Sequence, residues 1–204
     1  MRIAIIYSGY LRLWERMLKP NKKYLFTSET DLFFYTYDEP IGYTYKQFIK
    51  IGSADKDDLF YGRAYYDEVK NLYEANQSFN IDRQANILQQ WHNNFISFCL
   101  VPTDYDVYVR SRGDVILNGK IDFHKYSYPH NRIYIPQSID WGGVNDQFAF
   151  GGYRAMKVYY SLYIEYFKRN GYLVPLYPEH SLLEHMLLNG IEIERIDVEH
   201  QIER

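Results

Sequence analysis

Hydrophobic and polar positions follow two different periods along this chain, and together they predict an α/β fold. Short runs of apolar and β-branched residues are typical of buried strands, whereas apolar residues three or four positions apart are typical of amphipathic helices. The runs predict strands over residues 2–7, 31–37, 105–109, 133–136, 148–151 and 191–198. The helical spacing predicts helices over residues 11–18, 80–100, 153–170 and 181–188. We expect the first helix to stop near Pro20, which has no backbone N–H to donate.

The elements form one unit along the sequence. No repeat, low-complexity segment or linker divides the chain, so we expect a single α/β domain over residues 1–204. Residues 41–80 fit the pattern least, because they are polar and rich in tyrosine. We expect an insertion of mixed helix and loop there, which could be mobile.

The stretch from Tyr105 to Leu117 organises the rest. It begins as a strand and then places Arg110, Arg112 and Asp114 before a second apolar run. Charged residues within a β-branched run are costly to bury unless they are paired or bind a ligand. Ligands of open α/β sheets bind beyond the carboxyl ends of the strands, where this cluster would lie. Guanidinium groups and a metal-bound carboxylate both suit a diphosphate, although a strand-end salt bridge explains the same residues.

Two turns carry further polar candidates. The Ser8-Gly9 turn joins the first strand to the first helix, an arrangement that can present backbone N–H groups to a phosphate or base. Asn145, Asp146 and Gln147 follow a glycine-rich turn, and one carboxylate with two amides suits sugar hydroxyls or the positioning of an acceptor. Each turn also has a plain structural reading, as a connection or as an Asx turn and strand cap.

Glu179 and His180 begin a helix after Pro178. An acid is favoured in a first helical turn for electrostatic reasons, but Glu179 is also a candidate to contact an acceptor or act as a base. His180 and His185 are five positions apart and point to different faces, and no HExxH pattern surrounds them. A zinc site is therefore not expected.

Composition excludes several classes of protein. The net charge of −3 gives no sign of nucleic-acid binding, and the single cysteine, Cys99, excludes an internal disulfide and fits a reducing compartment. The apolar run after Arg2 is too short for a signal sequence or a membrane span, so we expect a cytoplasmic protein without a transmembrane segment. The 23 tyrosines suit stacking on bases and sugar rings, or filling of the core.

Taken together, these clusters resemble a group of GT-A-type glycosyltransferases found in large DNA viruses and in bacterial surface-polysaccharide gene clusters. Each piece is short, but five occur in the same order and span nearly the whole chain except residues 41–80. The matching pieces are Ile3–Arg12, Asp31–Thr36, Tyr105–Asp114, Asn145–Gly151 and Pro178–His180.

The resemblance implies a GT-A, Rossmann-like fold with a mostly parallel central sheet flanked by helices. It implies a nucleoside-diphosphate-sugar donor, UDP- or GDP-sugar, and a glycan acceptor, and a viral member would work in the host cytoplasm. It also implies a divalent metal, Mn²⁺ or Mg²⁺, at Asp114. The positions that it assigns to the nucleotide sugar are Ser8, Gly9, Arg12, Thr36, Arg110, Arg112 and Asp114.

On the acceptor side, the resemblance and the loop chemistry assign Asp146 and Glu179 as candidate catalytic groups. Trp141, Asn145, Gln147 and His180 are the candidate acceptor contacts. One departure matters: the Asp-x-Asp usual in GT-A enzymes is here Arg112-Gly113-Asp114, which leaves one carboxylate. We therefore expect metal binding to be weak or optional, with Arg112 doing part of the work of the cation.

Two other functions are compatible with parts of the sequence. A non-catalytic carbohydrate- or nucleotide-binding domain of the same fold would explain the single carboxylate and the many tyrosines. A dinucleotide-dependent oxidoreductase is disfavoured, because no Gly-x-Gly-x-x-Gly follows the first strand. The sequence does not choose between an inverting and a retaining transfer.

Overall fold

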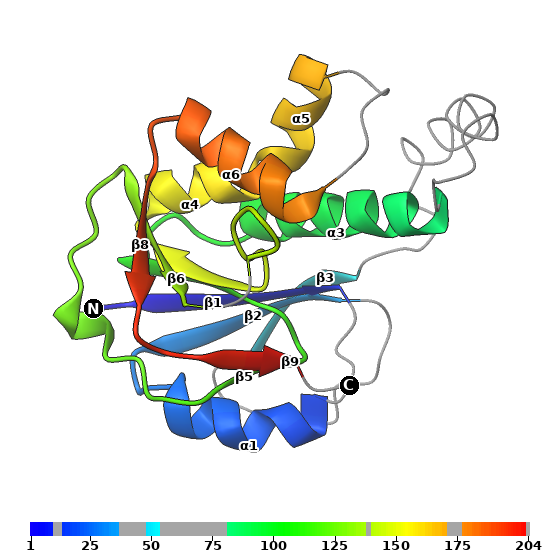
Figure 1. Ribbon diagram of the computed structural model, residues 1–204. Coiled ribbons are helices and arrows are strands. Elements are labelled where there is room, and N and C mark those ends of the chain that lie inside the picture. The colour runs from blue at the N-terminus through cyan, green and yellow to red at the C-terminus, as the bar shows by residue number, and fades with distance from the viewer. Residues whose placement is uncertain (10–13, 37–47, 54–80, 138–139, 171–176, 203–204) are drawn as a thin grey trace.

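A seven-stranded sheet runs through the middle of the molecule in a computed structural model (Figure 1). The structure describes residues 1–9, 14–36, 48–53, 81–137, 140–170 and 177–202. In spatial order the strands are β3 (Phe48–Ser53), β2 (Thr30–Thr36), β1 (Ile3–Gly9), β4 (Val107–Ser111), β7 (Phe148–Gly151), β6 (Arg132–Pro136) and β8 (Glu192–Ile196).

Most neighbouring strands are parallel, which confirms the predicted fold class. Strand β1 pairs in parallel with β2 and β4, β2 with β3, and β6 with β8, whereas β7 is antiparallel to both of its neighbours. The carboxyl ends of β1, β2 and β4 therefore meet at one edge of the sheet. Ligands of α/β sheets bind at this edge.

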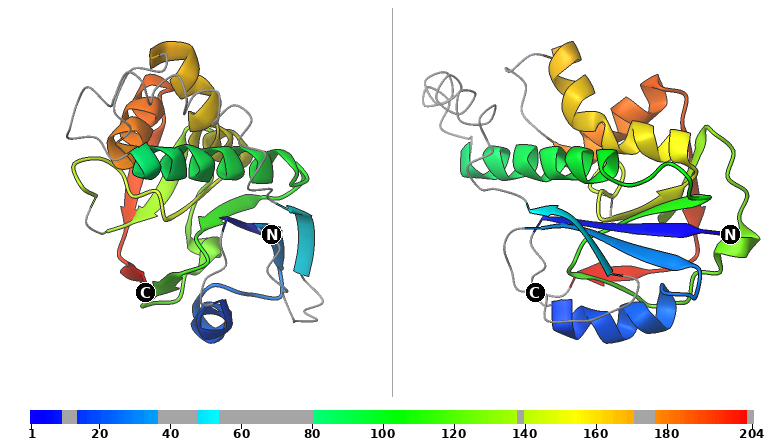
Figure 2. Two further views of the ribbon diagram at one scale, coloured as in Figure 1. Left: turned by 90° about the vertical axis from the view of Figure 1, so that its right-hand side faces the viewer. Right: turned by 180° about the vertical axis from the view of Figure 1, so that it is seen from behind.

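Helices cover both faces of the sheet (Figures 1 and 2). One face carries α3 (Ile81–Cys99), α4 (Tyr153–Tyr160), α5 (Leu162–Asn170) and α6 (Pro178–Leu188). The other carries α1 (Trp14–Tyr24), the two-stranded sheet of β5 (Val115–Leu117) and β9 (His200–Ile202), and the 3₁₀ turn Phe123–Lys125. Because both faces are covered, a strand such as β1 is apolar over consecutive positions.

Side chains of β1 and β4 alternate between two hydrophobic clusters. Ala4, Ile6 and Tyr108 belong to the cluster on the α3 face, whereas Val107 and Val109 belong to the cluster on the α1 face. Because successive strand residues point to opposite faces, the next positions on the α3 face are Ser8 on β1 and Arg110 on β4. This parity directs both polar side chains to the space between the sheet edge and α3.

Helix α1 does not stop at Pro20, as its sequence predicts, but continues to Tyr24 with Pro20 inside it. Proline removes only its own N–H bond, and burial of one helix face offsets that loss. Met17, Asn21 and Leu25 are buried at spacings of four residues, on the side that packs against β5. The predicted start of this helix at residue 11 lies outside the described residues.

The predicted helix over 153–170 is two helices, α4 and α5, divided at Ser161. The backbone N–H of Ser161 is shared between the carbonyl oxygens of Lys157 and Val158, a tightened turn that ends α4. The ring Nε2 of His185, from α6, lies 2.8 Å from the Val158 carbonyl oxygen and donates to it. A buried contact between helices thus accompanies a break that residue periodicity could not reveal.

Three of the described strands, β3, β5 and β9, were not predicted as strands, although the apolar run that forms β5 was noted. Strand β3 lies within the stretch expected to be helix and loop, residues 41–80, whose remaining residues lie outside the described part. The last predicted strand, over 191–198, is shorter in the structure, and β9 follows it and pairs with β5. None of the described helices combines the length and the apolar character needed to cross a membrane.

Candidate functional site

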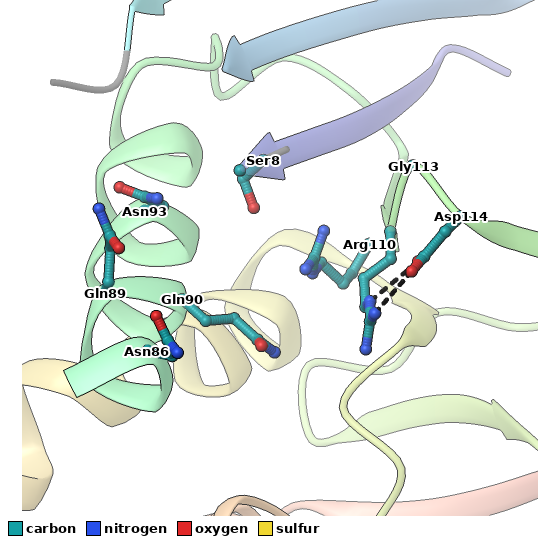
Figure 3. A pocket seen from close by; sticks show the side chains of 10 residues that line it. Ser8, Asn86, Gln89, Gln90, Asn93, Arg110, Gly113 and Asp114 are labelled. Carbon is teal, nitrogen blue, oxygen red and sulfur yellow. Dashed lines mark hydrogen bonds and ion pairs between the residues drawn. The ribbon is translucent and has the colours of Figure 1, made fainter. Parts of the chain in front are cut away.

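A polar cleft of about 310 Å³ opens where β1 and β4 end, between the edge of the sheet and α3 (Figure 3). Residues from both strands, from the turn after β4 and from α3 line it. The described lining residues are Ser8, Gly9, Asn86, Gln89, Gln90, Asn93, Arg110, Arg112, Gly113 and Asp114. The cleft thus contains five of the seven positions assigned to the nucleotide sugar by sequence.

Arg110 is the most buried charged residue of the cleft, with 1% of its surface exposed. Its Nη1 donates to the carbonyl oxygen of Ser111 at 2.7 Å, while its Nε is buried without a hydrogen-bond partner. No carboxylate in the described part of the chain forms an ion pair with it. A buried cation with an unsatisfied donor is costly, so this side chain suits an anion that the described residues do not supply.

Three buried tyrosines near Arg110 do not provide that anion. Burial raises the pKa of the hydroxyl groups of Tyr7, Tyr159 and Tyr160, although the charge of Arg110 partly opposes the shift. The hydroxyls therefore stay neutral at ordinary pH. Among the described residues Arg110 thus lies near neutral tyrosine rings and makes no ion pair with a carboxylate.

Arg112 forms a bidentate ion pair with Asp114 across the turn after β4. Its Nε donates to Oδ1 at 3.0 Å and its Nη2 to Oδ2 at 2.7 Å. The backbone N–H of Arg112 also donates to the Gln147 carbonyl oxygen at 3.1 Å, which ties this turn to the strand start of β7. The salt bridge that the sequence left open as an alternative is therefore present, and it lies inside the cleft.

The described residues do not fit a metal held by the protein. Mg²⁺ and Mn²⁺ need several oxygen ligands, yet Asp114 is the one acid among the described residues that line the cleft. Both of its carboxylate oxygens already accept from Arg112. In the described chain no three His, Cys, Asp or Glu side chains gather as a metal would need. That Asp114 is a metal ligand stays a prediction from the sequence, and no step below is routed through a metal.

The carboxyl end of β1 places Ser8 and Gly9 at the rim of the cleft. Ser8 Oγ donates to Oδ1 of Asn94 on α3 at 2.5 Å, so this hydroxyl fixes the strand end against the helix. Gly9 has φ of +87°, a conformation that other residues adopt only with strain. Thr36 pairs with Gly9 in the parallel register and is buried, with its hydroxyl unpartnered among the described residues. Arg12 lies outside the described part of the chain.

The amides that α3 contributes to the cleft were not predicted from the sequence. Asn86, Gln89, Gln90 and Asn93 recur at spacings of three and four residues, so they share one face of the helix. Figure 3 shows Gln90 extending from α3 toward the side of the cleft that holds Arg110 and Asp114. The signal was available, because this amide stripe has the same period as the apolar stripe that predicted the helix.

Asp146 is buried beside the cleft rather than in its lining, with 9% of its surface exposed. Its Oδ2 accepts a hydrogen bond of 2.5 Å from Nε2 of Gln90. The pKa of the Tyr159 hydroxyl is raised by burial first and by the charge of Asp146 second, so the carboxylate faces that neutral ring. Gln90 thus connects the predicted catalytic carboxylate to the wall of the cleft.

Asn145 and Gln147 have internal partners. Asn145 is buried, and its Nδ2 lies 2.9 Å from Nε2 of His200, which is also 2.9 Å from Oε1 of Gln147. The backbone N–H of Gln147 donates to Asn145 Oδ1 at 2.7 Å. Burial lowers the pKa of His200, so its ring is neutral in this network. These contacts hold the loop, and neither amide lines the cleft.

Trp141 and His180 lie together on a different surface. Trp141 is 72% exposed and has φ of 48°, while Gly142 packs so closely on His180 that a Cβ there would lie 2.6 Å from its ring Nε2. The backbone of Glu179 accepts from the Val144 N–H at 3.0 Å. The glycine turn is thereby seated on the first turn of α6, and these residues are not among those that line the cleft.

Comparison with known proteins supports the fold. Neither a protein-family model nor a curated protein matches the chain. The apo form of the glycosyltransferase GlyE from Streptococcus pneumoniae TIGR4 superposes with a TM-score of 0.52 at 10% identity, covering 95% of this chain and 44% of GlyE. A second GlyE structure gives 0.50 at 12% identity over 96% of this chain and 45% of GlyE.

Mouse xyloside xylosyltransferase 1, also in its apo form, superposes with a TM-score of 0.51 at 12% identity. The match covers 96% of this chain and 85% of the mouse chain, whereas this chain spans less than half of GlyE. At such identities the likeness shows a shared fold, which is the GT-A fold of glycosyltransferases.

Proposed function

We propose that the protein is a glycosyltransferase that moves a sugar from a nucleoside diphosphate to a hydroxyl group of a glycan. The observation that carries the proposal is Arg110, a buried guanidinium without an ion-pair partner among the described residues, at the carboxyl edge of a GT-A sheet. A diphosphate is the anion that matches this place, because parallel α/β sheets bind phosphorylated ligands at that edge. Arg112 lies in the same cleft and presents a second guanidinium.

The donor would lie with its diphosphate against the two arginines. Ser8 and Gly9 at the end of β1, with Arg12 and Thr36, are the proposed contacts of the nucleoside, which we expect to be uridine or guanosine. The α3 amides face the arginines across the cleft and can both donate to and accept from sugar hydroxyls. A neutral sugar bound between the arginines and the amides would have hydrogen-bond partners on both sides.

The chemistry is a substitution at the anomeric carbon. The bond between that carbon and the diphosphate oxygen breaks, and its electron pair stays on the oxygen. The acceptor hydroxyl oxygen forms the new bond to carbon and loses its proton to a base, for which we propose Asp146, with Glu179 as the other candidate. Charge develops on the leaving oxygen, so fixed cations beside it stabilise the transition state more than the ground state.

The acceptor glycan would approach past the loop before β7. Trp141 is the best contact there, because an exposed indole offers a flat apolar face for a sugar ring. His180, packed against the same turn, is a proposed second contact. Asn145 and Gln147 would act by holding the loop in place, since their amides have internal partners.

Calorimetric titration with UDP-, GDP- and TDP-sugars tests the proposal. We expect the sugars of one nucleobase to bind the native protein. Their affinity should fall by at least about tenfold in Arg110→Met, because a charge-assisted contact is removed. Arg154→Gln, an exposed arginine on α4, is the matched control and should bind normally. Binding of none of these donors to the native protein would refute the proposal. Tight binding without transfer or donor hydrolysis would favour a non-catalytic binding domain.

A further inference from the structure

The cleft contains more positive than negative charge. Its described lining holds two guanidinium groups, Arg110 and Arg112, and one carboxylate, Asp114. Asp114 is paired with Arg112, which leaves Arg110 without an ion-pair partner in the described part of the chain. The protein therefore already provides, without any added ion, the surplus cation that a diphosphate needs.

A divalent cation at Asp114 would conflict with this arrangement. It would have to share the carboxylate with Arg112, because Nε and Nη2 already donate to one oxygen each. It would also add positive charge to a cleft that two guanidinium groups already line, and like charges in a partly buried site repel strongly. One remaining carboxylate is a poor set of ligands against those costs.

We propose that this cleft stabilises the departing diphosphate with Arg110 and Arg112 in place of a divalent metal. The inference rests on the proposed glycosyl transfer and specifies how its leaving group is stabilised. Arg110 approaches from the floor of the cleft, on β4, and Arg112 from the turn that follows. Two fixed guanidinium groups offer directional donors to the phosphate oxygens and need no metal to be recruited with the donor.

Asp114 then has a different role from the one predicted, as a positioning residue for Arg112. Its carboxylate holds the Nε edge of the guanidinium, and the backbone bond to Gln147 fixes the residue from the other side. Figure 3 shows the two hydrogen bonds at Asp114 and the Arg110 side chain next to them. The Nη1 of Arg112 has no partner among the described residues, which leaves it available to a ligand in the cleft.

The first test is sugar transfer in excess EDTA, with the donor that binds best in the titrations. After exhaustive chelation we expect a rate within about twofold of the rate with added Mn²⁺, because no metal contributes to the transition state. Calorimetry with EDTA should likewise give an unchanged affinity for the nucleoside diphosphate. Transfer that stops with EDTA and returns with Mn²⁺ would overturn the inference while leaving the proposed function intact.

The second test is a double-mutant cycle of Arg112→Gln and Asp114→Asn. Each single variant should lower kcat by about tenfold or more while thermal unfolding shows a folded protein. If Asp114 acts only through Arg112, the double variant should be no slower than Arg112→Gln, because contacting residues that act as a unit are not additive. Additive losses, or a loss of Mn²⁺ stimulation in Asp114→Asn alone, would give Asp114 an independent role and contradict the proposal.

Failure of the inference and failure of the proposed function give different results. If the native protein neither binds nor turns over any nucleotide sugar with or without Mn²⁺, the proposed function is wrong and the inference falls with it. If transfer is observed, metal dependence and the double-mutant cycle decide the inference alone. Arg154→Gln serves again as the arginine control.

Discussion

The side-chain amide of Gln90 donates a hydrogen bond of 2.5 Å to the carboxylate of Asp146, and so joins helix α3 to the loop before β7. The two residues are far apart in the sequence, and no local pattern relates them. One belongs to the wall of the proposed donor cleft and the other is the proposed base. Their bond gives the two halves of the site a fixed relationship.

Replacing Gln90 with glutamate should make stability depend on pH. A second carboxylate beside Asp146 would force one of the pair to hold a proton in the folded state, so its pKa rises above the unfolded value of about 4. The folded state then binds more protons than the unfolded state, and stability falls as pH rises above about 4. Denaturant unfolding at several pH values measures this. Gln89→Glu, the neighbouring cleft position without a carboxylate partner among the described residues, should show a much smaller slope.

Arg110→Met should stabilise the fold while it removes ligand binding. The substitution removes a buried charge that has no ion-pair partner among the described residues, and we expect the free energy of unfolding to rise by about 1–2 kcal/mol. Urea unfolding without ligand is the measurement. A clear loss of stability would show instead that the cation is a structural requirement, and would weaken the assignment of Arg110 to an anion.

His200 should make the native protein less stable in mild acid. Burial lowers its pKa in the folded state, so the unfolded chain takes up a proton first as pH falls below about 6.5. Stability is therefore highest above that pH and decreases as pH falls toward the folded pKa. His200→Gln keeps a polar group opposite Asn145 and Gln147 but cannot titrate, and it should flatten this part of the pH profile. His130→Gln, at an exposed site, should leave the profile unchanged.

Gly143→Ala should destabilise the loop that carries Trp141. An added Cβ would lie 2.2 Å from the backbone of Glu179, so either the loop or the start of α6 must move. We expect a loss of about 2–3 kcal/mol, since the clash is with backbone rather than with an adaptable side chain. Gly119→Ala meets only the Val198 side chain at 4.0 Å and should cost little. Equal thermal stability of the two variants would contradict this packing.

Much of the fold is readable from the sequence because burial leaves local patterns. Strand β1 is apolar at consecutive positions and the apolar stripe of α3 has a helical period, so both were predicted. Strand β9 and the break at Ser161 were not, because each depends on a partner distant in the sequence: β5 for the strand and His185 for the break. The passage of α1 through Pro20 likewise depends on tertiary packing.

Candidate site residues could be predicted where charged or polar side chains follow the end of a predicted strand. Arg110, Arg112 and Asp114 were recognised because charges interrupt a β-branched run, and the structure brings them together with Ser8 and Gly9. The partners of these side chains were not predictable, because a salt bridge and a ligand site would have the same residues at the same positions in the sequence. The internal bonds of Asn145 to His200 depend in the same way on the chain returning beside the loop.

Strand β4 lies between β1 and β7, and its register is fixed on both sides, with Arg110 opposite Ile6 and Ala149. The alternation of side chains along β4 therefore determines which of them face the cleft. A slip of one residue would turn Arg110 toward the apolar cluster on the α1 face and present Val109 to the cleft instead. A substitution at position 110 changes one side chain of the cleft, whereas a single-residue insertion or deletion within β4 would eliminate the cationic floor in one step.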